Sequence, residues 1–310
     1  MMQRVQFDLG KPDLDKLLSV ADGDLLYRGV KRRENDKTST TIMHGRVPYI
    51  TYNIFAPYAD EMIHGFSTRL GGVSREHLES LNLSFSRGDD PENVTENFRR
   101  FSEAVGFDHT RAVFSDQVHD TALHRVTEED CGKGIIRESD IRGIDGLMTD
   151  VPGIPIMTFF ADCVPVFFYD PEHKAIALSH SGWRGTVGDI AGKTIRRMRE
   201  EFDSAPERIV TAIGPSICMD CYEVSEDVAS LFMEKYKDTG DMGTVLMDKG
   251  NGKYQLNLHE AVRRNLLAAG VKEEHIAMPD LCTCCNPRFF FSHRASKGMR
   301  GNLAAVMALK

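Results

Sequence analysis

The 310-residue chain lacks most of the features that mark membrane, secreted or nucleic-acid-binding proteins. No apolar run approaches the roughly 20 residues of a membrane-spanning helix. The first residues, MMQRVQFDLGKPDLDKLL, include acidic side chains and no apolar signal core, so we expect no secretory leader. Basic residues are outnumbered, 38 Lys and Arg against 46 Asp and Glu, and the net charge is −8. We therefore expect neither a nucleic-acid nor a membrane partner.

Cysteine is present in an odd number, seven, which does not suit a framework of paired disulfides. We expect reduced thiols or metal ligands, and with them a cytoplasmic location. The hydrophobic fraction of 41% and the charged fraction of 27% are those of an ordinary globular protein, so a normal buried core is predicted.

Hydrophobic periodicity predicts alternating strands and helices in a single α/β domain. Residues 1–46 look like an N-terminal extension, with a short helix between Leu14 and Ala21, and residues 47–310 form the body. Hairpins and helical crossovers are interleaved there, which indicates mixed rather than purely parallel sheets. The predicted strands cover 48–52, 62–67, 111–118, 153–169, 174–179, 209–213 and 289–292, and the predicted helices 91–105, 187–202, 224–236 and 258–269.

The stretch IPIMTFFADCVPVFFYDPEHKAIALSHSGWRGTVG, residues 154–188, predicts two strands, a Gly-rich turn and a helix. If Asp170–His173 form a β-turn with Pro171 at its second position, Cys163 lies directly opposite His180 in the hairpin. Opposed side chains share a face, with Cβ atoms about 4.5–5.5 Å apart. Cys163 and His180 are then close enough to bind one metal ion.

His119, at the end of the segment Gln117-Val118-His119, is the best candidate for a third ligand. Two His and one Cys make a zinc site with an open fourth position, which is the pattern of catalytic zinc. The simpler alternative is that Cys163 is a small buried hydrophobe and His180 a hydrogen-bonded structural residue.

The turn Ser181–Thr186 leads into a helix and is a candidate for phosphate binding. Arg184 offers a fork of donors, and the backbone of Gly185 and Thr186 offers N–H groups at a helix start. The alternative is an ordinary Gly-rich strand-to-helix turn.

Two further residues are candidates for substrate binding. Arg69 lies in a second Gly-rich turn, Ser67–Ser74, and we expect it to contact phosphate. Asn82 lies between two leucines and needs hydrogen-bond partners once buried, so it either caps backbone groups or contacts a nucleoside.

Four other cysteines form two C-x-x-C pairs, Cys218 with Cys221 and Cys282 with Cys285. Four thiolates suit a structural zinc ion, but 60 residues separate the pairs. Ordinary zinc ribbons have roughly 15–20 residues there. A redox pair and unligated thiols are the alternatives.

Several motifs occur together in the order that is typical of one protein family. They are HGFSTRLGGVS (64–74), SLNL (80–83), the N-x-x-R of Asn97 and Arg100, QVH (117–119), DGLMTDVPG (145–153), TFFADCVPV (158–166), HSGWRG (180–185), IGPSICMDCYEV (213–224) and DLCTCC…FFFSHR (280–294). Through these motifs residues 47–310 resemble the laccase-domain family, the YfiH-like group also called peptidoglycan editing factor or purine nucleoside phosphorylase. One departure is His293, which stands where the family often has Tyr and alters a pocket wall.

The resemblance implies a four-layer α/β/β/α fold with mixed sheets and a zinc site on His119, Cys163 and His180. It also implies phosphorolysis of purine nucleosides (adenosine, inosine and methylthioadenosine) to free base and ribose 1-phosphate, together with adenosine deamination. Family members have also been called copper polyphenol oxidases. We discount copper, because the chain lacks an obvious blue-copper ligand set with an axial Met.

We therefore predict a zinc-dependent purine nucleoside phosphorylase with adenosine deaminase activity, in which Cys163 and His180 serve catalysis. Zinc deaminases need a carboxylate as proton carrier, and Asp162 is the nearest candidate, although a strand neighbour of Cys163 should face the other way. Two alternatives stay open. One is a metal-independent cysteine hydrolase with Cys163 as nucleophile and His180 as base, and the other is a non-catalytic thiol or metal sensor built on the C-x-x-C pairs.

Overall fold

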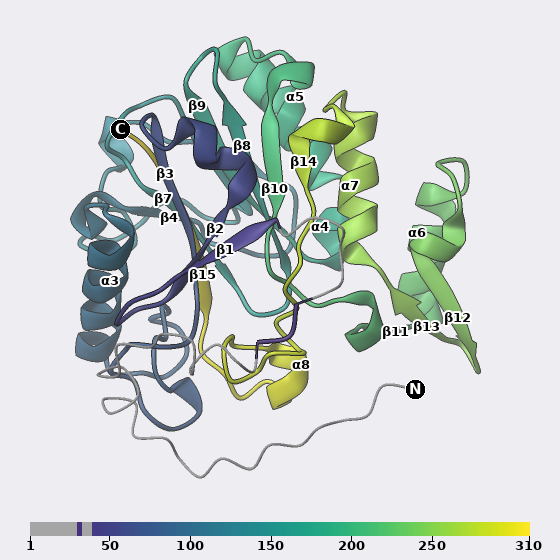
Figure 1. Ribbon diagram of the computed structural model, residues 1–310, viewed down its shortest axis with the longest axis horizontal. Coiled ribbons are helices and arrows are strands. Elements are labelled where there is room, and N and C mark those ends of the chain that lie inside the picture. The colour runs from purple at the N-terminus through teal and green to yellow at the C-terminus, as the bar shows by residue number, and fades with distance from the viewer. Residues whose placement is uncertain (1–29, 33–38) are drawn as a thin grey trace.

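The computed structural model describes residues 30–32 and 39–310, and in this part of the chain the strands form two six-stranded sheets and one three-stranded sheet (Figure 1). In spatial order the first sheet contains β1 (Thr40–Met43), β2 (Tyr49–Tyr52), β3 (Met62–Ser67), β15 (Leu303–Leu309), β7 (Ile156–Phe160) and β4 (Val113–Phe114). The second contains β14 (Ile276–Ala277), β10 (Val210–Ile213), β8 (Val164–Asp170), β9 (Ala175–Ser181), β6 (Gly146–Thr149) and β5 (Leu123–Arg125). The small sheet contains β11 (Glu223–Ser225), β13 (Lys253–Leu256) and β12 (Leu246–Gly250).

Both large sheets are mixed. The strand β4 runs parallel to β7 in the first sheet, and β5 with β6 and β10 with β14 are the parallel pairs of the second. The other pairs are antiparallel, including the hairpin of β8 and β9. The predicted α/β class with mixed sheets is confirmed.

Helices cover the outer faces of the two large sheets (Figure 1). The helix α3 (Pro91–Val105) lies on one side of the molecule, and α5 (Ile190–Phe202) and α7 (Leu258–Ala268) lie on the other. The helix α6 (Glu226–Tyr236) lies with the small sheet beyond α7, and α4 (Trp183–Val187) and α8 (His293–Ser296) are short. The order of layers is helix, sheet, sheet, helix, which matches the four-layer arrangement implied by the resemblance.

Three hydrophobic clusters fill the three spaces between these layers. Residues such as Phe66, Leu178 and Met307 join the two sheets in the central cluster. A second cluster joins the outer face of the second sheet to α5 and α7, and a third joins the first sheet to α3. The strand β8 shows how one segment serves two of them, because Phe167 faces the other sheet and Phe168 faces the helices. A strand that is buried on both faces has a continuous apolar sequence.

The predicted register of the hairpin is wrong by two residues. His180 lies opposite Pro165, not opposite Cys163. The cause is the loop, because Asp170 lies at the end of β8 and its carboxylate accepts hydrogen bonds from the backbone N–H groups of Glu172 and His173. A shift of two residues keeps every side chain on its original face, so Cys163 and His180 stay on one side.

The predicted strand over 153–169 is divided in two. Its first half, β7, belongs to the first sheet and its second half, β8, to the second. The chain crosses between the sheets at Ala161–Cys163, where Asp162 has a positive φ of 88° that interrupts the pleat. Cys163 therefore lies at a corner between the sheets.

The predicted closing strand over 289–292 is wrong. Phe289 and Phe290 lie in a turn, where their backbone N–H groups donate to the carbonyl oxygen of Asn286. The C-terminal strand is β15, which the sequence analysis missed, and it lies in the interior of the first sheet between β3 and β7. The apolar run of three phenylalanines fills the central cluster from a loop instead.

Several predicted elements agree with the structure. The helix over 91–105 and the strand over 62–67 have the predicted bounds. The helix predicted over 187–202 begins at Ile190, after Asp189 caps it by accepting from the N–H of Gly192. The helix predicted between Leu14 and Ala21 lies outside the described residues.

The extension boundary at residue 46 stays a prediction, although the first sheet already takes in β1 from residue 40. Within the described part of the chain, no helix combines the length and the apolar composition that crossing a membrane requires.

We expect Leu178→Ala to destabilise the protein by about 2–5 kcal/mol, because Leu178 is fully buried between the two sheets and its loss leaves a cavity. The matched control is Leu231→Ala on α6, where the leucine is 47% exposed and a change of only about 0.5 kcal/mol is expected. Urea unfolding followed by circular dichroism measures both. Equal losses in the two variants would contradict the proposed central core.

Candidate metal and catalytic site

The three predicted ligands converge at one end of the two large sheets. His119 follows β4 on a loop, Cys163 lies at the crossing between β7 and β8, and His180 lies near the end of β9. One ligand atom from each residue lies within 4.8 Å of the ligand atoms of the other two. His119 is exposed, Cys163 is half-buried and His180 is buried, so the site opens to solvent on the His119 side.

The buried carboxylate of Asp145 orders this site. It accepts backbone hydrogen bonds from Val118, His119 and Asp120, each at 3.0 Å. Its Oδ1 also lies 2.7 Å from Nδ1 of His180, and its carbonyl oxygen accepts from the N–H of His180 at 2.7 Å. Asp145 is fully buried, so one carboxylate holds two of the three ligands by backbone and side chain together.

This arrangement assigns the two ring nitrogens of His180. Because Nδ1 donates to Asp145, Nε2 is left for a metal ion, as in the carboxylate–histidine–metal triads of zinc proteins. Burial raises the pKa of the Asp145 carboxyl, but the hydrogen bonds from His180 and from the backbone outweigh it and the pKa is lowered. Asp145 therefore stays ionised.

The thiol and the imidazole shift each other's ionisation. Burial raises the pKa of the Cys163 thiol, but the charge of His180 and hydrogen bonds from both histidines lower it below its ordinary value. Burial lowers the pKa of His180, whereas the charge of Cys163 and the bond to Asp145 raise it above its ordinary value. The thiolate form, which is the form that binds metals, is therefore favoured.

Gly182 leaves the space at the centre of the three ligands. A Cβ atom at this position would lie 3.0 Å from Cδ2 of His119 and 3.2 Å from Sγ of Cys163. Any larger residue would push these ligands apart or occupy the site itself. The donors, the ring orientation and this space together fit a metal ion of the zinc type.

His119 itself adopts a left-handed backbone conformation with φ of 64°. Such a conformation is uncommon for a residue other than glycine. The three N–H bonds to Asp145 hold the loop in this shape and direct the ring towards His180, whose ring centroid is 4.8 Å away.

Asp162 is turned away from the three ligands. Its carboxylate accepts from Oγ1 of Thr283 at 2.6 Å, from Oγ of Ser292 at 3.0 Å and from the N–H of Arg294 at 2.7 Å. It therefore anchors the segment 283–294 to the corner that carries Cys163. The role of Asp162 as a proton carrier stays a prediction.

Arg69 and Asn82 are already engaged by the chain. Arg69 donates to the carbonyl oxygens of Glu79 and Pro287, and its guanidinium lies 4.5 Å from the ring centroid of Phe291. Asn82 is fully buried, donates to Asp89 and accepts from the N–H of Asn302. Both residues brace loops, and their substrate contacts stay predictions.

The turn after β9 contains a cation, Arg184, without an ion-pair partner among the described residues. Arg184 is exposed, and its guanidinium lies 4.2 Å from the ring centroid of Trp183. No ion pair of the described residues includes it. Thr186 is buried and donates from its backbone N–H and its hydroxyl to the carbonyl oxygen of Gly182, while Gly185 lies inside the short helix α4.

Arg300 is a cation that the sequence analysis missed. Burial and the neighbouring Arg87 lower the pKa of its guanidinium to about 10, while the charges of Cys163 and Asp162 oppose this shift. Its Nε is buried without a hydrogen-bond partner, and no ion pair among the described residues includes Arg300 or Arg87. Arg300 therefore brings a positive charge without an ion-pair partner to the neighbourhood of Cys163, and no local pattern in the sequence marks it.

A family model described as "Multi-copper polyphenol oxidoreductase laccase" matches residues 63–310. The chain belongs to this laccase family. Its predicted membership is confirmed, and the residues described above lie within the matched range.

The named relatives are enzymes that act on purine nucleosides. The chain is 37% identical to "Purine nucleoside phosphorylase YlmD" of Geobacillus stearothermophilus over 81% of its length and 92% of the relative's. It is 34% identical to "Adenosine deaminase RL5" of an unknown prokaryotic organism, over 76% of this chain and 89% of the relative.

Solved structures in the laccase family share the fold. The structure of YlmD from Geobacillus stearothermophilus superposes with a TM-score of 0.79 at 32% identity, covering 91% of this chain and 99% of that one. The Bacillus licheniformis protein YfiH gives a TM-score of 0.78 at 31% identity, covering 84% and 96%.

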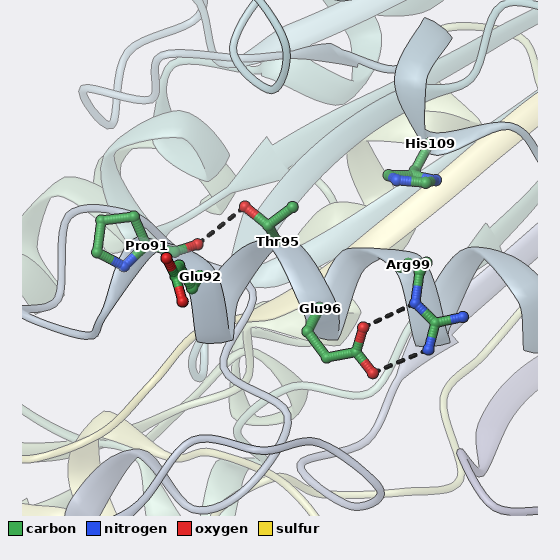
Figure 2. A pocket seen from close by; sticks show the side chains of 6 residues that line it. All are labelled: Pro91, Glu92, Thr95, Glu96, Arg99 and His109. Carbon is green, nitrogen blue, oxygen red and sulfur yellow. Dashed lines mark hydrogen bonds and ion pairs between the residues drawn. The ribbon is translucent and has the colours of Figure 1, made fainter.

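An open pocket also lies along α3, lined by Pro91, Glu92, Thr95, Glu96, Arg99 and His109 (Figure 2). Arg99 is paired with Glu96, and Thr95 donates to the carbonyl oxygen of Pro91. This pocket contains none of the three ligands, and its arginine is already paired with Glu96 on the same helix.

We expect Asp145→Asn to weaken metal binding about 10- to 100-fold, because the amide removes the charge that orients His180 and places donors opposite donors. Competition with a chromogenic zinc chelator measures the affinity. Asp150→Asn is the matched control, since Asp150 follows β6 at its other end and pairs with Arg125. An Asp145→Asn affinity equal to that of the control would contradict this role.

Proposed function

We propose that this chain is a zinc-dependent purine nucleoside phosphorylase that also deaminates adenosine. The observation that carries the proposal is the convergence of His119, Cys163 and His180 around the space left by Gly182. Relatives named purine nucleoside phosphorylase and adenosine deaminase support the same chemistry. The substrates are purine nucleosides and phosphate, and a cytoplasmic location is part of the proposal.

The donor set favours zinc. Two imidazole nitrogens and one thiolate are ligands of catalytic zinc, which keeps a further position open, and the exposed side of His119 provides access. Zinc bound by these residues would supply a Lewis acid beside the substrate. We favour zinc over the copper of the family's description, because an axial Met of the blue-copper kind was not found in the sequence.

The chain's own residues supply orientation and positive charge. Asp145 holds His180 and the loop of His119 in one geometry, so little reorganisation is needed when substrate binds. Arg300 and Arg184 have no ion-pair partner among the described residues, and we assign both to phosphate. Phosphate held next to the ribose is then positioned to attack the anomeric carbon as the base departs.

Inosine should be cleaved to hypoxanthine and ribose 1-phosphate, and methylthioadenosine to adenine and 5-methylthioribose 1-phosphate, only when phosphate is present, because phosphate is the attacking group. Liquid chromatography of the products with and without phosphate measures this. Cys163→Ser should lose the zinc ion of this site and cleavage together, with Cys131→Ser as the control, since Cys131 lies outside both groups of candidate ligands. Phosphate-independent release of hypoxanthine from inosine would refute phosphorolysis.

The ionisation of Cys163 and His180 also suits a second candidate, a metal-independent cysteine hydrolase with a thiolate nucleophile and an imidazole base. Chelation and thiol alkylation distinguish the two functions. Activity that survives exhaustive chelation but is lost on thiol alkylation would support the hydrolase and reject the zinc enzyme.

Arg300→Gln should raise KM for phosphate about 10- to 100-fold, because a hydrogen bond to a charged group contributes about 1.5–3 kcal/mol. KM for the nucleoside should change much less. Steady-state kinetics with each substrate varied in turn measures both constants. Arg197→Gln on α5, where the arginine pairs with Glu201, is the control. Equal increases in both KM values would show a general disturbance of the site instead of phosphate binding.

A further inference from the structure

Four cysteines outside the proposed catalytic site gather their sulfur atoms in one place. The Sγ atoms of Cys218, Cys221, Cys282 and Cys285 all lie within 4.8 Å of one another. Cys285 lies 3.9 Å from Cys218 and 3.5 Å from Cys221, sulfur to sulfur. The two C-x-x-C pairs, which lie far apart in the sequence, are therefore neighbours in space.

We propose that these four thiolates bind a second metal ion, a structural zinc. Four sulfurs around zinc at about 2.3 Å form a tetrahedron whose edges are about 3.8 Å long. The distances of 3.9 Å and 3.5 Å are close to these edges. They are far from the roughly 2.05 Å of a disulfide bond.

The backbone around the cluster suits a thiolate centre. The N–H groups of Cys218 and Cys285 both point at Sγ of Cys282, at 3.2 Å and 3.4 Å. Hydrogen bonds to a ligating atom orient it and spread its negative charge. Two of the cysteines, Cys218 and Cys282, are buried, and a group of four thiols with this geometry has no open position for a substrate.

The zinc ion would link two loops that both contact Asp162, at the corner of the chain that carries Cys163. Ser216 pairs with Cys282 in an isolated bridge, and the N–H of Ile217 donates to the carbonyl oxygen of Asp162. From the other loop, Thr283 donates to the carboxylate of Asp162, which directly precedes Cys163. The cluster thus lies beside the residues that set the position of the catalytic thiolate, although it shares no ligand with that site.

The test variant lacks the two histidine ligands of the proposed catalytic site and keeps all four cysteines of the second site. We expect His119→Ala with His180→Ala to retain about one zinc ion per chain after loading with zinc and gel filtration, measured by plasma mass spectrometry. X-ray absorption at the zinc edge should then show sulfur neighbours alone, at about 2.3 Å. This variant separates the inference from the proposed function, because nucleoside cleavage is not part of the readout.

A set of cysteine variants provides the matched comparison. In the same background Cys282→Ser should lose the remaining zinc, and Cys131→Ser should keep it. If Cys282→Ser does not fold, the parent variant is titrated with a mercurial thiol reagent, and zinc should be released as its cysteine thiols react. A zinc-free parent variant, nitrogen or oxygen scatterers at the zinc edge, or a disulfide between Cys221 and Cys285 in the isolated protein would overturn the inference.

Discussion

The candidate site depends on one buried carboxylate. A carboxylate in the interior must be fully hydrogen-bonded, and Asp145 meets this requirement with three backbone N–H groups and the ring of His180. The same bonds stabilise the left-handed backbone of His119 and the ring orientation of His180. The hydrogen bonds that satisfy the carboxylate of Asp145 therefore also hold the two metal ligands, His119 and His180, in place.

The crossing of the chain between the sheets supplies the third ligand. A strand that stayed in one sheet would bury Cys163 in the apolar interior, as its neighbours Val164 and Phe160 are buried. The positive φ of Asp162 breaks the strand instead and brings the thiol to the edge, where loops from both sheets meet. His119 and Cys163 thus lie on irregular backbone between the two sheets, whereas His180 lies near the end of β9.

Local pattern was enough to predict some parts of this structure and not others. The bounds of α3 follow from its apolar stripe, from Asp90 as its N-cap and from Gly106 at its end. The hairpin register did not follow, because Asp170 caps a longer loop than the turn residues suggest. The ligand atoms of Cys163 and His180 nevertheless lie within 4.8 Å of each other, since a two-residue shift preserves the face.

The roles of Asp145, Gly182 and Arg300 in the site were not predicted from the sequence, because each role depends on partners that are distant in the chain.

The two cysteine pairs show why a large fold would use a metal ion away from its catalytic site. The segment 281–292 contains no long helix or strand, yet it fills the core with Phe290 and braces Asp162. Such a segment gains little from secondary structure and must be fixed by tertiary contacts. A link between residues that have 60 others between them removes more chain entropy than a link within a short loop. A zinc ion between the pairs would therefore stabilise a segment that has little secondary structure of its own, and with it the corner that presents Cys163.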